Sequence, residues 1–327
     1  MRVAYHQRKR GAGRSIERVF AAVRSAMPKR VVCQGVECPR PSRGVLPRLH
    51  NMAHAARIRG ELHHVTGDVH YVALALPAGR TILTIHDCVS LNRLKGLRRD
   101  VLKLFWYSLP IRRCALVTTI SSFSKDELLK NVDANPDKIR VVHDPLPSGF
   151  EPCSAKFDTR KPVLLHVGTK ENKNLERVAR ALEGITCRLE VVGRVDERQR
   201  AILAECRIDW SESYGLTDQE LLATYRQCDM VVFASTYEGF GMPILEAQAT
   251  GRPLVTSNIC SMPEVAGEGA CLVDPFSVAS IREGVLRVCA DSAYREDLVA
   301  AGLENVRRFR PERIAADYLA LYEEVLP

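Results

Sequence analysis

Apolar strand-like segments and amphipathic helix-like segments alternate along the whole chain, and this alternation limits the fold more than any other feature. It is typical of α/β domains with parallel sheets, because each parallel strand needs a crossover before the next. The 327 residues are enough for two domains of ordinary size. We therefore predict an α/β protein with two doubly wound, Rossmann-like domains. The expected strands are RVAY, RVVCQ, HHVT, TILTIHD, ALVTTIS, VLLHVG, RLEVVG, MVVFAS, PLVTS and ACLVD.

A Pro-rich, apolar-poor segment, HDPLPSGFEPCSAKFDTRKP, lies between the two halves and is interpreted as a linker. We place the first domain at residues 1–152 and the second at 153–310. A helix over residues 311–327 is expected to pack back towards the first domain. Ligands of doubly wound sheets bind outside the carboxyl ends of the strands, so two such domains should enclose a cleft there. The other expected helices cover residues 14–27, 97–113, 122–132, 174–183, 196–206, 218–228, 243–250, 276–290 and 293–309.

The charged residues are distributed unequally between the two halves of the chain. Residues 1–150 contain 26 Lys and Arg against 11 Asp and Glu, a net charge of +15. Residues 151–327 contain 21 against 28, a net charge of −7. The first half is therefore expected to meet an anionic partner, such as a membrane surface or an anionic acceptor.

The eleven cysteines are scattered and none form a CxxC pair, which argues against a disulfide framework or a structural zinc site. No apolar run reaches the roughly 18–20 residues of a membrane span. The basic N-terminus is interpreted as a strand, a turn and a helix rather than a transit peptide. We expect a cytoplasmic protein, with peripheral attachment at the inner membrane face left open.

The segment TYEGFG joins the strand MVVFAS to the helix PILEAQATG. Gly239 and Gly241 allow backbone N–H groups to approach a ligand, and the helix N-terminus favours an anion. A carboxylate repels phosphate but accepts hydrogen bonds from sugar hydroxyls, so Glu238 and Glu246 suit a ligand with hydroxyls near a phosphate. A simpler interpretation of Glu246 is an acidic residue that complements the helix dipole.

Two further loops follow predicted strands. In VLLHVGTKENKN, Gly168 ends a strand and Lys173 precedes a helix, which suits a diphosphate. TILTIHD ends with His86 and Asp87, and a lone histidine after a strand is more often structural than catalytic. Gly11 and Gly13 follow the first strand, but Ile16 takes the place of the third glycine of a dinucleotide-binding GxGxxG.

The stretch EGFGMPILEAQATGRP, with two glutamates eight positions apart, resembles the donor-site signature of family 4 retaining glycosyltransferases (glycosyltransferase group 1). VVGR, TDQELLATYRQCDMVVFAS and SMPEVAGEGACLVDP are similar to further segments of that family. The similarity covers nearly all of residues 160–310, and the first half matches more loosely. It implies the GT-B fold, in which an acceptor-side domain and a nucleotide-sugar-binding domain face each other across a cleft.

The resemblance also implies roles for residues of the second half. Glu238 would contact hydroxyls of the donor sugar and act in catalysis. Gly239, Phe240 and Gly241 would present backbone amides to sugar and phosphate, and Glu246 would accept hydrogen bonds from the ribose.

In the loop after Gly168, Lys173 would neutralise the donor phosphates. Thr169 stands where the family usually has an arginine, so we expect Lys170 or Arg194 to supply the second positive charge.

In the first half, the resemblance implies that His86 lines the sugar site and that the loop with Gly11, Gly13 and Arg14 faces the acceptor. The expected reaction is retaining transfer of a hexose, with mannose favoured, from a GDP- or UDP-linked donor to a glycan or lipid-linked acceptor. We expect no metal site, no cofactor besides the donor substrate, and no nucleic acid partner.

Alternatives from other classes stay open. The same fold supports nucleotide-sugar epimerases and phosphorylases. Two Rossmann-like halves also suit a nicotinamide-dependent oxidoreductase, although the incomplete GxGxxG counts against it. The basic first half suits a nucleic-acid binder, but no aromatic-rich basic module accompanies the charge.

Overall fold

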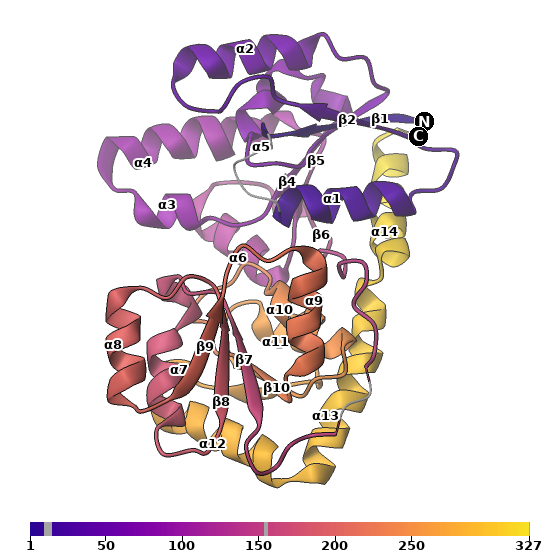
Figure 1. The fold of residues 1–327 in the computed structure, drawn as a ribbon. Coiled ribbons are helices and arrows are strands. Elements are labelled where there is room, and N and C mark those ends of the chain that lie inside the picture. The colour runs from indigo at the N-terminus through magenta and orange to yellow at the C-terminus, as the bar shows by residue number, and fades with distance from the viewer. Residues whose placement is uncertain (10–14, 154–155, 327) are drawn as a thin grey trace. The chain divides into compact units, whose positions relative to one another are not determined.

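The computed structural model describes residues 1–9, 15–153 and 156–326. The chain forms two compact units, each built around a six-stranded parallel sheet with flanking helices (Figure 1). The first unit contains Met1–Pro147 and Phe309–Pro327, and the second contains Ser148–Arg308. The chain therefore leaves the first unit five residues before the boundary that we placed at residue 152, and its last segment returns to that unit.

The first sheet has the strand order β2-β1-β3-β4-β5-β6, and all of its pairs are parallel. The four strands in the middle of the sheet, with the sequences RVAYHQ, LHHV, TILTI and LVTT, are almost wholly buried, and this burial includes their His and Thr side chains. The strands are β1 (Arg2–Gln7), β2 (Val32–Glu37), β3 (Leu62–Val65), β4 (Thr81–Ile85), β5 (Leu116–Thr119) and β6 (Ile139–Val141).

The last helix closes the core of the first unit. It begins with Pro311 in its first turn, where the missing N–H has no helical partner to lose. Its Tyr322 donates a hydrogen bond to Tyr5 and contacts His64, both in the first sheet. The helices of this unit are α1 (Ser15–Ala26), α2 (Val45–Ala56), η1 (His70–Ala75), η2 (Ala78–Arg80), α3 (Val89–Arg93), α4 (Gly96–Leu102), η3 (Lys103–Ser108), α5 (Leu109–Arg113), α6 (Ser122–Asn131), η4 (Pro136–Lys138) and α14 (Pro311–Val325).

The second sheet has the strand order β12-β11-β10-β7-β8-β9, again wholly parallel. Its strands are β7 (Val163–Val167), β8 (Arg188–Val192), β9 (Asp209–Ser213), β10 (Met230–Phe233), β11 (Leu254–Ser257) and β12 (Cys271–Val273). Its helices are η5 (Glu171–Lys173), α7 (Leu175–Leu182), α8 (Glu197–Glu205), α9 (Asp218–Gln227), α10 (Met242–Ala249), α11 (Met262–Ala266), α12 (Val278–Ala290), α13 (Ser292–Asn305) and η6 (Val306–Phe309).

Several elements were absent from our sequence prediction. The edge strand β9, with the sequence DWSES, is polar, and β6 has three residues, so neither carries a buried apolar run. The helix α2 contains Pro47, a residue that usually breaks helices. The helix expected over 97–113 is interrupted by the π-helical turn η3. Within the described residues, no helix has the length and apolar character needed to cross a bilayer.

Candidate functional site

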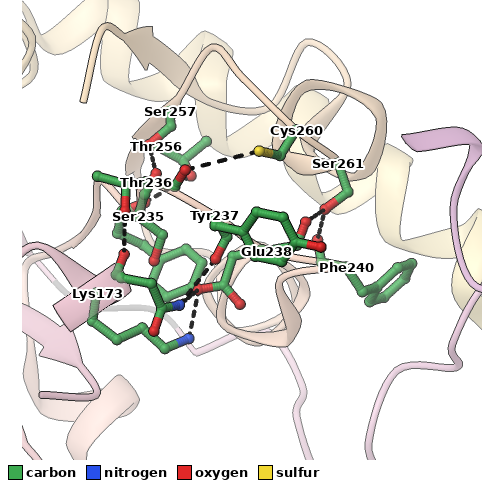
Figure 2. A network of polar contacts seen from close by, with 12 residues as sticks. Lys173, Ser235, Thr236, Tyr237, Glu238, Phe240, Thr256, Ser257, Cys260 and Ser261 are labelled. Carbon is green, nitrogen blue, oxygen red and sulfur yellow. Dashed lines mark hydrogen bonds and ion pairs between the residues drawn. The ribbon is translucent and has the colours of Figure 1, made fainter. Parts of the chain in front are cut away.

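The loops after β7 and β10 meet at the carboxyl edge of the second sheet, because these strands are direct neighbours. Lys173, from the first loop, points at Glu238, from the second, and Figure 2 shows the contact. Lys173 Nζ lies 2.7 Å from Glu238 Oε1. The two side chains are 19% and 14% exposed. The cation and the carboxylate that the sequence assigned to donor binding are thus joined in one partly buried ion pair.

Asn172 links the same two loops. Its Nδ2 donates to the Tyr237 carbonyl at 2.9 Å and to Glu238 Oε1 at 3.2 Å. The backbone N–H of Thr236 donates to the Asn172 carbonyl at 2.8 Å. Glu238 Oε1 therefore accepts from both Lys173 and Asn172. Our sequence analysis quoted the NKN segment for its lysine and gave Asn172 no role.

Gly168 makes room for the lysine side chain. Its φ is +95°, in the left-handed region that glycine tolerates. A Cβ atom at this position would lie 2.9 Å from Lys173 Cγ, and Lys173 Nζ lies 4.7 Å from the centre of the Phe233 ring. The lysine thus lies against a glycine and an aromatic face, which fixes the position of its charge.

Ser261, from the loop after β11, supports the glutamate loop. Its hydroxyl lies 2.9 Å from the Glu238 carbonyl and 2.8 Å from the Phe240 carbonyl, so it donates between the two (Figure 2). Ser257 Oγ donates to the Ser235 carbonyl at 2.6 Å. We quoted the SMPEVAGEG segment only as a resemblance, and its hydroxyl contacts were not predicted.

The glycines of the glutamate loop lead directly into α10. Gly241 is the residue before the helix and has a φ of +104°. Pro243 lies in the first turn, and the ring of Phe240 is buried. The turn from strand to helix is therefore tight, and the N–H groups at the start of α10 face the same edge of the sheet as Glu238. Gly239 and Gly241 occupy the loop that the sequence placed there.

Glu246 lies in the middle of α10 and is 8% exposed. Tyr225, on α9, donates its hydroxyl to Glu246 Oε2 at 2.6 Å. Burial, followed by the charge of Glu246, raises the pKa of Tyr225 well above its usual value, so the tyrosine remains a donor. The simple helix-dipole interpretation does not explain a buried carboxylate with a dedicated donor. Tyr225 lies 21 residues before Glu246 and was not predicted.

Both candidates for the second positive charge, Lys170 and Arg194, are exposed. Thr169 lies against Gly193, and its carbonyl accepts a hydrogen bond from Gln199 at 2.7 Å. Arg194 lies over the ring of Tyr214, with 4.8 Å between the guanidinium carbon and the ring centre.

In the first unit, His86 directly follows β4. Its Nε2 lies 3.0 Å from the Thr66 carbonyl. A carbonyl only accepts, so Nε2 must carry a hydrogen. The His86 carbonyl itself accepts from Ser124 Oγ at 3.3 Å. The predicted acceptor loop with Gly11, Gly13 and Arg14 lies outside the described residues.

Cysteine chemistry and metal ligation do not extend this site. None of the eleven cysteines, all of which lie among the described residues, forms a disulfide, and burial raises the pKa of several thiols, such as Cys88 and Cys228, to about 12. Within residues 1–9, 15–153 and 156–326, no three His, Cys, Asp or Glu side chains form a group that could hold a metal ion.

Comparison with known proteins gives a family for the second unit. The family described as "Glycosyl transferases group 1" matches residues 151–304. The chain is 26% identical to an Escherichia coli O-antigen chain mannosyltransferase B, over 75% of this chain and 70% of that protein. It is also 26% identical to a phosphatidyl-myo-inositol mannosyltransferase of Mycobacterium leprae, over 92% and 85%. The serotype-specific mannosyltransferase WbdA of E. coli is longer, and the 26% identical match spans 32% of its length.

The fold is also found among solved structures. Alr3699/HepE from Anabaena, in complex with UDP and glucose, matches with a TM-score of 0.76 and 16% identity, over 99% of each chain. The two parallel six-stranded sheets with flanking helices are those of the GT-B glycosyltransferases, which confirms the fold class expected from the sequence.

Proposed function

Since this chain is a glycosyltransferase whose residues 151–304 belong to the glycosyl transferases group 1 family, we propose that it transfers mannose from GDP-mannose to a glycan or lipid-linked acceptor, with retention at the anomeric carbon. The observation that carries this proposal is the ion pair between Lys173 and Glu238. Lys173 is a cation that can neutralise phosphate, and Glu238 can accept hydrogen bonds from sugar hydroxyls. One hydrogen bond joins the two side chains beside the N-terminus of α10. A nucleoside-diphosphate sugar carries both matching groups.

Donor binding then requires an exchange of partners. The diphosphate takes over Lys173 and the N–H groups at the start of α10, and hydroxyls of the sugar take over Glu238. Lys173 leaves a carboxylate for a phosphate, so its charge stays paired, and Glu238 leaves a cation for neutral hydroxyls that donate hydrogen bonds to it. The lysine and the amides are held in place before the reaction, which suits stabilisation of the charge that develops on the leaving diphosphate.

The ribose is the proposed partner of Glu246. The Tyr225 hydroxyl holds one carboxylate oxygen at 2.6 Å and orients the group. Ribose hydroxyls are the ligand that such a carboxylate recognises beside a nucleotide.

The choice of mannose rests on the mannosyltransferase relatives. A UDP-linked hexose is the second candidate, because a protein of the same fold is known in complex with UDP and glucose. We propose that no cofactor or metal is needed besides the donor.

In the proposed reaction, the bond from the anomeric carbon to the diphosphate oxygen breaks and a bond to the acceptor oxygen forms on the same face. The acceptor proton goes to the leaving diphosphate. His86, in the first unit, is the group that we propose stabilises the negative charge that develops on the leaving diphosphate.

Product analysis tests the reaction class. The protein is incubated with GDP-mannose or UDP-glucose, with and without glycan acceptors, and anomeric configuration is read by NMR. The proposal predicts an α-linked product that forms only with acceptor. A changed donor without acceptor would instead identify an epimerase, and turnover of NAD(P) would identify an oxidoreductase.

We further propose that the first unit attaches to an anionic membrane surface. Four large apolar side chains are exposed at helical spacing on α4 and η3: Leu97 (78%), Val101 (49%), Leu104 (43%) and Phe105 (48%). Residues at this spacing share one face of a helix.

Basic residues surround this apolar face. Arg93, Lys95 and Arg98 are exposed, and Lys103 is half-buried, whereas Asp100 is the one acid between residues 93 and 105. An apolar helix face flanked by Lys and Arg is the pattern of an interfacial, membrane-surface helix.

Sedimentation with vesicles tests this attachment. The wild-type protein should bind vesicles with phosphatidylglycerol at low salt and not vesicles of phosphatidylcholine alone. The double variant Leu97→Ser/Phe105→Ser should lose binding, while Leu286→Ser, which alters an equally apolar and 41% exposed side chain of α12, should keep it. Equal binding by both variants would contradict the assignment.

A further inference from the structure

The loop after β3 carries an acidic residue at the carboxyl edge of the first sheet. In the sheet order, β3 lies between β1 and β4, and Asp68 follows β3 by three residues. Asp68 is exposed. Residues 1–150 contain 11 acidic residues against 26 basic ones. An exposed carboxylate thus lies, within the basic half of the chain, at the edge where ligands of such sheets bind.

A buried tryptophan holds this carboxylate. Trp106, on η3, is 8% exposed, and its Nε1 donates to Asp68 Oδ1 at 3.0 Å. The guanidinium carbon of Arg48 lies 4.6 Å from the centre of the indole, and the ring of Tyr71 lies 4.8 Å from it, centre to centre. The Trp106 carbonyl accepts from His70 Nδ1 at 2.9 Å. The indole N–H is therefore a fixed donor, and it holds one oxygen of the exposed carboxylate in place.

Backbone contacts hold the rest of the same loop. Thr66 donates its backbone N–H to a carbonyl of β1 at 2.9 Å, and its own carbonyl accepts from His86 Nε2 at 3.0 Å. A Cβ atom at Gly67 would lie 2.9 Å from the backbone nitrogen of Arg8, so a side chain there would push the two segments apart. The loop is thus fixed between the segments after β1 and β4, and Asp68 comes two residues after the carbonyl that binds His86.

The carboxylate of Asp68 can accept more hydrogen bonds than Trp106 supplies. Its two oxygens offer about four lone-pair sites, and the indole N–H takes one. Hydroxyl groups donate to such oxygens, and a hydrogen bond to a charged acceptor is stronger than one between neutral groups. A phosphate would be repelled by the same charge. Asp68 therefore fits a neutral ligand that is rich in hydroxyls.

We propose that Asp68 binds hydroxyls of the acceptor glycan, and that Trp106 is the positioning residue that orients its carboxylate. This inference rests on the proposed function. It gives the first unit a carboxylate with a dedicated buried donor, as Tyr225 is for Glu246 in the second unit. The alternative is that Asp68 only satisfies the buried indole N–H, which needs a partner in any case. The two roles differ in whether the negative charge of Asp68 matters.

Asp68→Asn separates the two roles, because the amide oxygen of Asn can still accept from Trp106 while the charge is lost. The assay uses GDP-mannose as donor and α-linked mannobioses, short glycans of the proposed sugar, as acceptors. Acceptor KM should rise about tenfold, the scale of one hydrogen bond to a charged group. Donor KM and the hydrolysis of GDP-mannose without acceptor should stay unchanged.

Two further variants complete the kinetic test. Trp106→Phe keeps the carboxylate but removes the donor that orients it, so acceptor KM should rise by a smaller factor. That rise should vanish in the Asp68→Asn background if Trp106 acts through Asp68. Asp137→Asn is the matched control, because Asp137 is an exposed aspartate that precedes β6, at the opposite edge of the same sheet. It should leave all constants unchanged.

A binding experiment without donor separates this inference from the proposed function. The chain has two tryptophans, Trp106 and Trp210, and Trp210 lies on β9 in the second unit. Each gives one indole N–H signal in a proton–nitrogen correlation NMR spectrum. Added mannobiose should shift the Trp106 signal and leave that of Trp210 in place. Asp68→Asn should weaken mannobiose binding about tenfold, and Asp137→Asn should not.

Equal mannobiose affinity in the wild-type protein and Asp68→Asn would overturn the inference, even if glycosyl transfer is found. So would the absence of a shift at Trp106 with every mannobiose. Weaker binding by Asp68→Asn in a protein without transferase activity would support the sugar site and contradict only the proposed reaction.

Discussion

The two units differ in how a carboxylate near the carboxyl edge of each sheet is provided with hydrogen-bond partners. In the second unit, Glu238 is linked to Lys173 and Asn172, and Ser261 holds its backbone. In the first unit, Asp144 is buried, and one of its oxygens has no partner among the described residues. The first arrangement is satisfied before any ligand arrives, whereas the second bears an electrostatic cost in the folded protein. We therefore expect the donor edge to exchange partners when a ligand binds, whereas ionisation of the buried Asp144 is expected to cost the first unit stability.

The largest expected effect is at Glu238. Glu238→Ala removes the acceptor of sugar hydroxyls and the anchor of Lys173, so kcat should fall about 10²–10³-fold, as for other preorganised transition-state contacts. Donor KM should change much less. Steady-state kinetics with GDP-mannose measures both constants. A change confined to KM would mean that Glu238 serves ground-state binding alone.

A smaller effect is expected at Tyr225, on α9, and at its partner Glu246, on α10. Tyr225→Phe deletes the hydroxyl that orients Glu246 and leaves a buried carboxylate oxygen without its donor. Donor KM should rise about tenfold, equivalent to about 1.4 kcal/mol, with kcat nearly unchanged. Glu246→Gln should give the same pattern. If kcat fell as steeply as in Glu238→Ala, the assignment of Glu246 to the ribose would be wrong.

A comparison of Gly168→Ala with Gly215→Ala separates the effect of backbone strain from the effect of crowding Lys173. Gly168 and Gly215 both have positive φ, but a Cβ at Gly215 would have no heavy atom within 4 Å. Both alanine variants should lose about 1 kcal/mol of unfolding free energy from the backbone alone. Only Gly168→Ala should also weaken nucleotide binding. Urea unfolding and nucleotide titration measure the two quantities, and equal nucleotide affinity would contradict the role given to this contact.

The smallest expected effect is the stability cost of Asp144. Its folded pKa is raised by burial above the ordinary value of 3.8, so the folded state binds this proton more tightly than the unfolded chain. The wild-type protein should therefore lose stability as pH rises from 3.8 through the folded pKa. Asp144→Asn cannot ionise and should be more stable by about 1 kcal/mol above that range.

Urea unfolding at several pH values measures this difference, with the exposed Asp137→Asn as control. A variant that is less stable than the wild-type protein at every pH would show that the charge of Asp144 is well compensated.

Sequence patterns predicted the elements that carry the site better than the contacts within it. The alternation of strands and helices was enough for two Rossmann-like units, and the short motifs singled out Lys173 and Glu238, whose side chains form an ion pair in the structure. Asn172, Tyr225 and Ser261 act through hydrogen bonds to residues 21 or more positions away. Such pairings depend on which strands become neighbours, and no local pattern encodes them. The edge strand β9 was missed for a related reason, since its polar sequence follows from its place at the margin of the sheet.

The central claim is that Lys173 and Glu238 form a nucleotide-sugar site, and a melting-temperature panel tests it most directly. The wild-type protein and Lys173→Met are heated with GDP, UDP, GDP-mannose, UDP-glucose, NAD(P) and an oligonucleotide, with and without a divalent metal. A ligand that binds only the folded state raises the melting temperature by mass action. The account predicts that one nucleoside diphosphate and its sugar stabilise the wild-type protein without metal and fail to stabilise Lys173→Met. Stabilisation by NAD(P) or the oligonucleotide alone, or an equal shift in both proteins, would contradict it.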